Sequence, residues 1–413
     1  MKWVCALSTK VSLEAAVQEV AQRVLADLEG LQPDFGLLFV STTFSSDAPR
    51  LLPLLAEQIT IPHLIGCSGG GIMANGDELE DKPAISLMVG HLPGAKLKTF
   101  HLTDEIIPDL DSSPERWQEL IGVDQQLEPS FILLADPFSF PINDFLAGMD
   151  FAYPNQIKVG GLASGGGMNM LFCDRPGDGQ SSYRLVRQGL VGAALWGDLT
   201  IDAVVAQGCR PIGKTLQISQ SDRNIILAIE NRPPLEVLQA IVNDLSESDQ
   251  ALAETSLFMG VMMNEFKLQP ERGDFLIRNI VGVDPRNGAI AIGDRVRPGQ
   301  RIQLHLRDAE ASASDLSIAL SNYQQRSELV SPGQRPEAAL LFSCMGRGER
   351  LYGEAGFDSG IFLNYFEHLP LSGFFCSGEI GPVTNTTFLH GYTSVFGILR
   401  SRNGASAPSR PDR

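Results

Sequence analysis

The sequence has few positive charges for its length of 413 residues. Its 32 lysines and arginines stand against 49 aspartates and glutamates, which gives a net charge of −17. Proteins bind nucleic acids and anionic membrane surfaces through clusters of basic residues. The excess of acidic residues therefore argues against a nucleic-acid partner.

Long apolar runs are also missing. No uncharged apolar stretch approaches the roughly 20 residues that a membrane-spanning helix requires. The basic start at Lys2 is followed by an apolar run that ends by Ser8, which is too short for the core of a signal peptide. We therefore expect a cytoplasmic protein without membrane insertion.

The cysteines and histidines, six of each, are scattered along the chain. No CxxC pair occurs, so reduced thiols are expected rather than a disulfide framework. No two histidines have the i, i+4 spacing next to a carboxylate that is typical of a metal site. The sequence thus predicts neither a bound metal nor a cofactor.

What the sequence does contain is one short pattern that occurs three times. Each copy has an apolar strand, a helix-like stretch closed by proline, a second apolar strand and a turn built on Ser-Gly. The three turns lie at residues 66–71, 161–167 and 373–382. Another apolar run follows each turn. The pattern predicts an α/β fold with layered sheets built from repeated strand-helix-strand units.

The length suggests two or three domains. Between residues 208 and 234 the composition changes toward turn residues and short strands, so we predict domains at 1–215 and 234–400 with a linker at 216–233. The second half contains several short strands, which indicates an antiparallel strand-rich insert. The polar residues 401–413 are predicted to form a disordered tail.

The Ser-Gly turns are candidate ligand-binding sites, because consecutive glycines let several backbone N–H groups converge on an anion. The alternative is that these glycines only allow sharp turns and close packing of strands. The candidate residues from the turns are Ser68, Gly69, Gly70, Ser164, Gly165, Gly166, Ser377 and Gly378.

Four further candidates carry charge or can titrate. Arg347 and Glu379 lie at the two strand ends of the third copy, where they could hold the carboxylate and ammonium groups of an amino-acid-like ligand. They could equally form an ion pair with each other. Arg210 is a second candidate for binding an anion, and His390 could donate to a ligand or act as a base, although either could be structural.

Two short motifs match catalytic or nucleotide-binding patterns without the required context. Residues 66–70 fit the G-x-S-x-G motif of hydrolases, and residues 69–74 fit the dinucleotide motif G-x-G-x-x-A. Both motifs need a following helix, which Asn75, Gly76 and Pro83 disfavour. A hydrolase of small amides or esters that uses Cys376 or Ser68 with His390 as base remains an alternative, as does a structural scaffold.

Four segments resemble the signatures of FIST proteins, named for F-box and intracellular signal transduction. They are residues 207–213, 344–348, 373–382 and 388–393. The resemblance covers an N-terminal FIST part from about residue 35 to the 210s and a C-terminal FIST part from about residue 234 to 392. It implies a sensory module that recognises small ligands, with amino acids a suggested class.

The FIST parts leave no stretch long enough for a kinase, cyclase, receiver or F-box domain. We therefore expect a stand-alone sensory protein that binds a small polar metabolite and signals through a separate partner protein. The signature motifs contain glycine, arginine and glutamate without a coherent catalytic set. The sequence accordingly favours a binding protein over an enzyme.

Overall fold

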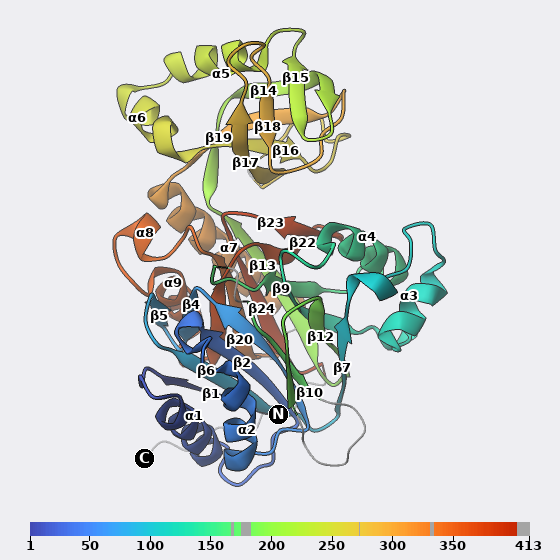
Figure 1. The fold of residues 1–413 in the computed structure, drawn as a ribbon, viewed down its shortest axis with the longest axis vertical. Coiled ribbons are helices and arrows are strands. Elements are labelled where there is room, and N and C mark those ends of the chain that lie inside the picture. Colours follow the sequence, from blue (N-terminus) through green and yellow to red (C-terminus); the bar gives the residue numbers. More distant parts are fainter. Residues whose placement is uncertain (167–168, 175–182, 272, 331–333, 403–413) are drawn as a thin grey trace. The chain divides into compact units, whose positions relative to one another are not determined.

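The computed structural model describes residues 1–166, 169–174, 183–271, 273–330 and 334–402 (Figure 1). The chain forms two compact units. The first, here called the three-sheet unit, comprises Met1–Val205, Ser317–Leu389 and the chain from Thr393 onward. The second, the barrel unit, comprises Ala206–Leu316 and His390–Tyr392. Gly167 of the second turn and residues 403–413 of the expected tail lie outside the described residues.

Within the described residues, the strands of the three-sheet unit form three six-stranded sheets. The first sheet has the order β1 (Lys2–Ser8), β6 (Ile85–His91), β2 (Phe35–Ser41), β3 (His63–Gly69), β10 (Leu171–Asp174), β11 (Tyr183–Val186). The second has the order β7 (Ala95–Leu102), β12 (Leu190–Gly197), β8 (Ser130–Ala135), β9 (Lys158–Leu162), β22 (Glu379–Val383), β23 (Thr386–His390). The third has the order β13 (Thr200–Gln207), β24 (Thr393–Arg400), β20 (Pro336–Cys344), β21 (Leu371–Cys376), β4 (Gly71–Ala74), β5 (Asp77–Glu80).

The three sheets share one pairing pattern. The two central strands of each sheet, β2 with β3, β8 with β9 and β20 with β21, are parallel. The strands on either side of each central pair are antiparallel to it. The layered α/β fold predicted from the sequence is confirmed.

In each sheet, the two strands at one edge come from a distant part of the chain. After β3 the chain crosses into the third sheet as β4 and β5, and after β9 it crosses into the first sheet as β10 and β11. After β21 it crosses into the second sheet as β22 and β23. The three Ser-Gly turns are therefore the points at which the chain passes from one sheet to another.

One apolar core lies between the three sheets. Successive side chains of a strand point to opposite faces, so the central strands are buried on both sides. In β2, Leu37 and Phe39 face this shared core, whereas Leu38 and Val40 pack on the outer side with helix residues. The core binds the sheets together, and helices cover their outer faces.

The helices follow the expected amphipathic spacing. In α1 (Leu13–Asp27) the Ser12 hydroxyl caps the first turn by accepting from Ala15 N, and Val17, Val20 and Val24 are buried along one face. The other helices of this unit are α2 (Ala48–Gln58), α3 (Pro114–Ile121), α4 (Ile142–Ala152), α8 (Glu349–Tyr352), α9 (Phe357–Tyr365) and the part of α7 (Ala309–Val330) from Ser317 onward, with short 3-10 turns at Thr42–Phe44, Asp104–Ile106 and Gln125–Leu127. No helix of the described chain has the length and apolarity needed to cross a bilayer.

The barrel unit is a closed antiparallel barrel, so the predicted antiparallel insert is confirmed. Its strand order is β14 (Cys209–Asp222), β15 (Ile225–Ile229), β18 (Ile290–Ile292), β17 (Phe275–Val283), β16 (Leu257–Met262), β19 (Arg301–Arg307). Helices α5 (Pro234–Asn243) and α6 (Glu247–Ser256) contribute to its core, and α7 (Ala309–Val330) follows its last strand.

The compact units divide the chain differently from the division at residues 215 and 234 expected from the sequence. Residues 216–233, expected to be a linker, form the end of β14 and all of β15. The side chains of Leu216, Ile218 and Ile226 are buried in the barrel core. The polar and turn residues in this segment therefore belong to the β-hairpin that β14 and β15 form in the barrel.

A glycine occupies the same register position in each parallel pair. Gly66, Gly160 and Gly373 lie opposite Leu38, Leu133 and Leu341, respectively. A Cβ added at these glycines would lie only 2.0, 1.8 and 1.8 Å from the carbonyl oxygen of the opposite leucine. The close approach of the central strands therefore requires glycine at these positions.

We predict that Gly373→Ala lowers the free energy of unfolding by about 2–3 kcal/mol, because the new methyl group would displace the Leu341 backbone. The matched control is Gly360→Ala in α9, where an added Cβ meets no atom within 4 Å. That control should be neutral or slightly stabilising. Urea denaturation measures both, and equal stabilities for the two variants would contradict the prediction.

Candidate functional site

The three turns meet at one place in the three-sheet unit. The Gly70 N–H donates to Ser164 Oγ at 2.8 Å, and that hydroxyl in turn donates to the Phe375 carbonyl. The Ser377 N–H donates to the Leu162 carbonyl at 3.1 Å, and Leu162 N–H donates to the Gly378 carbonyl at 2.8 Å. Each turn is therefore hydrogen-bonded to the segment beside another, and the crossings form one cluster.

Ser68 does not occupy the position that its sequence motif suggests. It lies inside β3, opposite Val40, and is fully buried. Its hydroxyl donates to the Ser164 carbonyl at 3.4 Å and accepts from Met170 N at 3.0 Å. Counted from the three equivalent glycines, the residue that corresponds to Ser164 and Ser377 is Gly70. The Ser-Gly motif of the first copy is thus out of step with the other two by two residues.

Three backbone N–H groups at the turns are already hydrogen-bonded. The N–H groups of Gly70, Ser164 and Ser377 all have protein acceptors. A hollow beside Gly70 has a volume of about 20 Å³, which is room for a single water molecule. It is lined by Gly70, Gly71, Glu80, Asp81, Met345, Arg350 and Phe375. In this conformation the turns join the sheets.

The glycines of the turns differ in their surroundings. Gly69 is buried, and an added Cβ there would lie 2.8 Å from Phe374 Cβ. Gly165 has a φ of 129° and faces Thr42 so closely that a Cβ would lie 1.9 Å from its methyl carbon. Gly166 has a φ of 74° and is exposed, with no atom near the position of a Cβ. Packing therefore explains Gly69 and Gly165, and backbone conformation explains Gly166.

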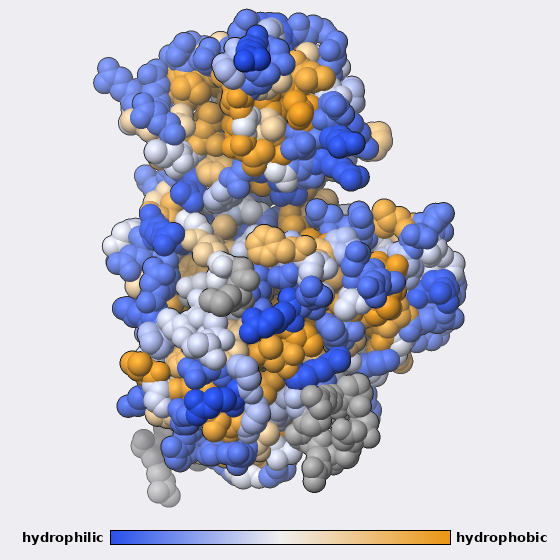
Figure 2. All heavy atoms as spheres, viewed as in Figure 1, coloured by the Kyte–Doolittle hydropathy of each residue, from blue (hydrophilic) through white to orange (hydrophobic). Residues whose placement is uncertain are grey.

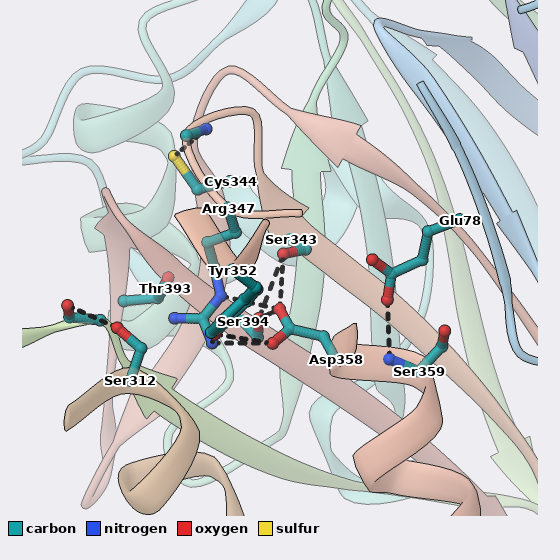
Figure 3. Close-up of polar contacts among 12 residues, drawn as sticks. Glu78, Ser312, Ser343, Cys344, Arg347, Tyr352, Asp358, Ser359, Thr393 and Ser394 are labelled. Atoms are coloured by element: carbon teal, nitrogen blue, oxygen red, sulfur yellow. Dashed lines mark hydrogen bonds and ion pairs between the residues drawn. The ribbon is translucent and has the colours of Figure 1, made fainter. Parts of the chain in front are cut away.

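Arg347 is fully buried and forms a bidentate ion pair (Figure 3). Its Nε and Nη2 donate to the Asp358 carboxylate at 2.7 and 2.9 Å, and Nη2 also donates to the Tyr352 hydroxyl. Its Nη1 has no hydrogen-bonding partner among the described residues. Burial opposes the charge of Arg347, but the neighbouring charge of Asp358 outweighs it and raises the arginine pKa. The guanidinium is therefore a fixed cation.

Asp358 is the hub of this cluster and was not among the predicted residues. Besides Arg347, its carboxylate accepts from the hydroxyls of Tyr352 at 3.0 Å, Ser343 at 3.1 Å and Ser394 (Figure 3). Burial alone would raise the Asp358 pKa, yet Arg347 and these donors lower it below its usual value. The sequence signal is an acid one helical turn before Phe362, on the buried face of α9.

Glu379 does not form the ion pair with Arg347 that was one of the two alternatives raised by the sequence, because Arg347 is paired with Asp358. Its side chain is fully buried, and Oε2 accepts from Thr393 N at 3.2 Å and Thr393 Oγ1 at 2.8 Å. Its Oε1 has no hydrogen bond of normal geometry within the described chain. Burial raises the pKa of Glu379 to about 8, against smaller opposing contributions from Thr393, Arg347 and Cys344.

Glu78 is a further buried carboxyl group of this unit and, like Glu379, has a raised pKa. Glu78 Oε1 accepts from Ser359 N at 2.7 Å, and its Oε2 has no partner among the described residues (Figure 3). Burial, and next the negative charge of Asp358, raise the Glu78 pKa to about 7. Glu78 fixes the start of α9 through Ser359.

The remaining two predicted residues belong to the barrel unit. Arg210 is ion-paired with Asp249 and with Asp308, the latter at 3.0 Å. Two carboxylates of the barrel unit therefore compensate its positive charge. His390 is buried, with 3% of its surface exposed, in the short segment His390–Tyr392. The structure thus assigns these two residues to a different compact unit from Arg347 and Glu379.

The hydrolase alternative lacks an activated nucleophile. Burial raises the pKa of Cys376 well above its usual value, so its thiolate is disfavoured. The Cys376 thiol donates to the Phe374 carbonyl at 3.4 Å, and the Ser68 hydroxyl donates to a backbone carbonyl inside the sheet. Among the described residues no group of three or more potential ligands could hold a metal ion.

The barrel unit carries a groove of about 680 Å³ beside α5 and α6, within the size range of small-molecule pockets. Its floor includes Phe258 and Tyr392, and Arg307 Cζ lies 5.9 and 5.3 Å from the centres of these two rings. Apolar side chains gather over the barrel strands and are bordered by hydrophilic ones (Figure 2). This groove is a second candidate site that the sequence patterns did not indicate.

We predict that Asp358→Asn lowers the free energy of unfolding by about 3–5 kcal/mol, because it leaves the buried Arg347 charge uncompensated. Glu119→Gln is the control, since the Arg116–Glu119 pair is exposed and should contribute little. Denaturation at neutral pH distinguishes the two variants. A small effect of Asp358→Asn would mean that the ion pair is dispensable.

Glu379 makes stability depend on pH. The folded protein holds its proton up to about pH 8, whereas the unfolded chain releases it above the usual value of 4.5. The stabilising contribution is therefore complete below the unfolded value and falls by about 1.4 kcal/mol per pH unit as the pH rises toward the folded value. Glu379→Gln removes this term, while the contribution of Glu78 is common to both proteins. Parallel stability profiles for wild type and variant between about pH 5 and 8 would refute it.

Proteins similar to this chain match it over nearly its whole length. Uncharacterized proteins of Mycobacterium tuberculosis and Mycobacterium bovis are 35% and 33% identical to it, over 95% of this chain and 98% and 97% of theirs. An F-box/LRR-repeat protein of Arabidopsis thaliana is 23% identical over 96% of this chain and 85% of that protein. A solved structure of T. maritima PurL complexed with ATP has 10% identity and a TM-score of 0.21, which is too low to support an argument.

Two family profiles together match most of the chain. The FIST N domain matches residues 34–232, and the FIST C domain matches residues 234–382. These spans agree with the resemblance noted in the sequence, which is thereby confirmed. The chain belongs to the FIST family.

Proposed function

We propose that this protein is a cytoplasmic sensor that binds a small polar metabolite and signals through a separate protein. FIST domains are sensory domains associated with signalling, which supports the general role. The signature segments contribute Cys344, Arg347, Glu379 and Thr393 to the three-sheet unit. The observation that carries the proposal is a buried donor, Arg347 Nη1, and a buried acceptor, Glu379 Oε1, both without partners among the described residues.

These two atoms suit a ligand with a carboxylate and an amine, such as an amino acid. A guanidinium N–H donates well to a carboxylate, and a carboxylate side chain accepts from an ammonium group. A buried polar atom without a partner costs on the order of 1–3 kcal/mol. A ligand that forms hydrogen bonds with both atoms would remove this cost, which favours binding at this place.

Burial of both atoms makes ligand binding dependent on a change of conformation. Arg347 and Glu379 are each fully buried, so a ligand reaches them only in a conformation that differs from this one. A ligand that binds one conformation better than another shifts the balance between them. Such a shift is what a separate signalling partner would recognise.

The rival location is the groove of the barrel unit. Its volume of about 680 Å³, and an arginine beside two aromatic rings that contact each other, would suit a larger, partly aromatic anion. Variants at Glu379 and Arg307 therefore separate the two locations. A structural scaffold, the remaining alternative, would bind no small molecule at either place.

We predict that mass spectrometry of small molecules released from the natively purified protein identifies a metabolite with a carboxylate and an amine. An amino-acid panel should then raise the melting temperature for the matching compound. Glu379→Gln should weaken binding by at least about tenfold, whereas Arg307→Gln should leave it unchanged.

Proton release gives an independent readout. The positive charge of a ligand ammonium group should lower the pKa of Glu379, which then releases its proton to the buffer, so the heat of binding near pH 7 should vary with the ionisation enthalpy of the buffer. The Glu379→Gln variant should lose this dependence. An empty protein with no thermal shift across the panel would exclude the proposed function, and loss of binding in Arg307→Gln alone would move the site to the groove.

A further inference from the structure

Tyr392 comes from the signature segment 388–393, and this residue belongs to the barrel unit. The strands on either side of it, β23 and β24, belong to two sheets of the three-sheet unit. The Tyr392 φ of 63° lies in the left-handed region, which bulky residues rarely adopt. Such conformations are costly and concentrate at functional sites. The contacts of the Tyr392 side chain therefore deserve a functional interpretation.

The Tyr392 side chain joins a cluster in the groove of the barrel unit. Phe258 and Asn279 lie directly opposite each other on β16 and β17, so their side chains share one face of the barrel. The Tyr392 hydroxyl donates to Asn279 Oδ1, and the ring centres of Tyr392 and Phe258 are 4.2 Å apart. Arg307 Cζ lies over both rings, 5.3 Å from the centre of Tyr392 and 5.9 Å from that of Phe258. These residues all line the groove, so a ligand there meets two aromatic rings and a guanidinium together.

Helix α5 supplies apolar side chains to the same groove. Leu235, Leu238 and Val242 are spaced by three and four residues, which places them on one face of the helix. Leu257 and Ile280 add apolar surface from β16 and β17. The volume of about 680 Å³ lies within the range of pockets that enclose a small organic molecule. The groove thus offers an apolar surface beside a cation.

The charges of the groove favour a ligand with one negative charge. Among the described residues that line it, Arg307 is the cation and Glu254, which is exposed, is the acid. A guanidinium that lies over aromatic faces can still donate along its edge, and its N–H groups match the two oxygens of a carboxylate. The net charge of −17 disfavours ligands with several negative charges. A single carboxylate on an apolar body therefore fits this lining.

We propose that the groove of the barrel unit binds aromatic monocarboxylates, whose ring packs against the apolar face of α5 and the rings of Phe258 and Tyr392 while the carboxylate pairs with Arg307. A flat ring extends the aromatic pair that Phe258 and Tyr392 already form, which an alkyl chain does less well. All lining residues belong to the barrel unit. This site is separate from Arg347 and Glu379 and does not rest on the proposed function.

We predict that 2-naphthoate binds the full chain with a dissociation constant of about 0.1 mM or lower, measured by the fluorescence anisotropy of the naphthoate. In displacement experiments, the neutral 2-naphthamide and the ring-free octanoate should each bind at least about tenfold more weakly. Arg307→Gln should weaken 2-naphthoate binding at least about tenfold, and Tyr392→Leu about fivefold. Arg297→Gln is the matched control and should bind normally, because Arg297 is an exposed residue of the same unit outside the groove lining.

The proposal is overturned if 2-naphthoate does not bind at about 1 mM, or if Arg307→Gln binds it no more weakly than Arg297→Gln. Equal affinity of 2-naphthamide would exclude the carboxylate contact, and equal affinity of octanoate would exclude the aromatic one. Both comparisons use the wild-type protein, so they remain decisive if Arg307→Gln does not fold. Amino-acid binding and its loss in Glu379→Gln test the proposed function, so either proposal can fail without the other.

Discussion

The three-sheet unit depends on the passage of the chain from each sheet into another. Each sheet is complete only when a hairpin from a distant part of the sequence pairs with its parallel centre. Without that hairpin each sheet would lack two strands and would expose an edge of its parallel centre. The crossings must also lie close together, since the strands they join belong to sheets that share one core. This explains the hydrogen bonds that connect Gly70, Ser164 and Ser377 to neighbouring turns.

Convergence of the crossings brings two of the four signature segments, residues 344–348 and 373–382, to one polar centre, whereas residues 207–213 belong to the barrel unit. The turn that contains Met345 donates to Cys376 across the parallel pair, and Glu379 begins the strand that leaves the third crossing. Four donors fix Asp358, and Asp358 fixes Arg347. One edge of the guanidinium is thereby held in place, while Nη1 is left without a partner in the described chain. A rigid framework that leaves one donor unused is suited to recognition.

Burial separates residues of the same type into different chemical roles. Cys376 and Cys344 lie opposite each other on β21 and β20, yet burial raises the pKa of the first well above its usual value, whereas the second is partly exposed. Likewise, Asp358 is ionised because Arg347 and hydroxyl groups surround it, whereas Glu379 keeps its proton. Local polarity, rather than residue identity, therefore assigns the chemistry of this site.

The sequence alone determined the layered α/β class, the strand-rich insert and the FIST family, because apolar periodicity and signature motifs are local properties. Only the tertiary structure placed Ser68 inside a strand, gave Arg347 the partner Asp358, and assigned residues 216–233 to the barrel. Strand register pairs residues that lie far apart in the chain. The Arg347–Asp358 ion pair depends on which face of α9 is buried. Neither can be inferred from a local pattern. The Ser-Gly motif identifies residues near each turn. Only the register of the parallel strand pairs shows that Gly70, rather than Ser68, corresponds to Ser164 and Ser377.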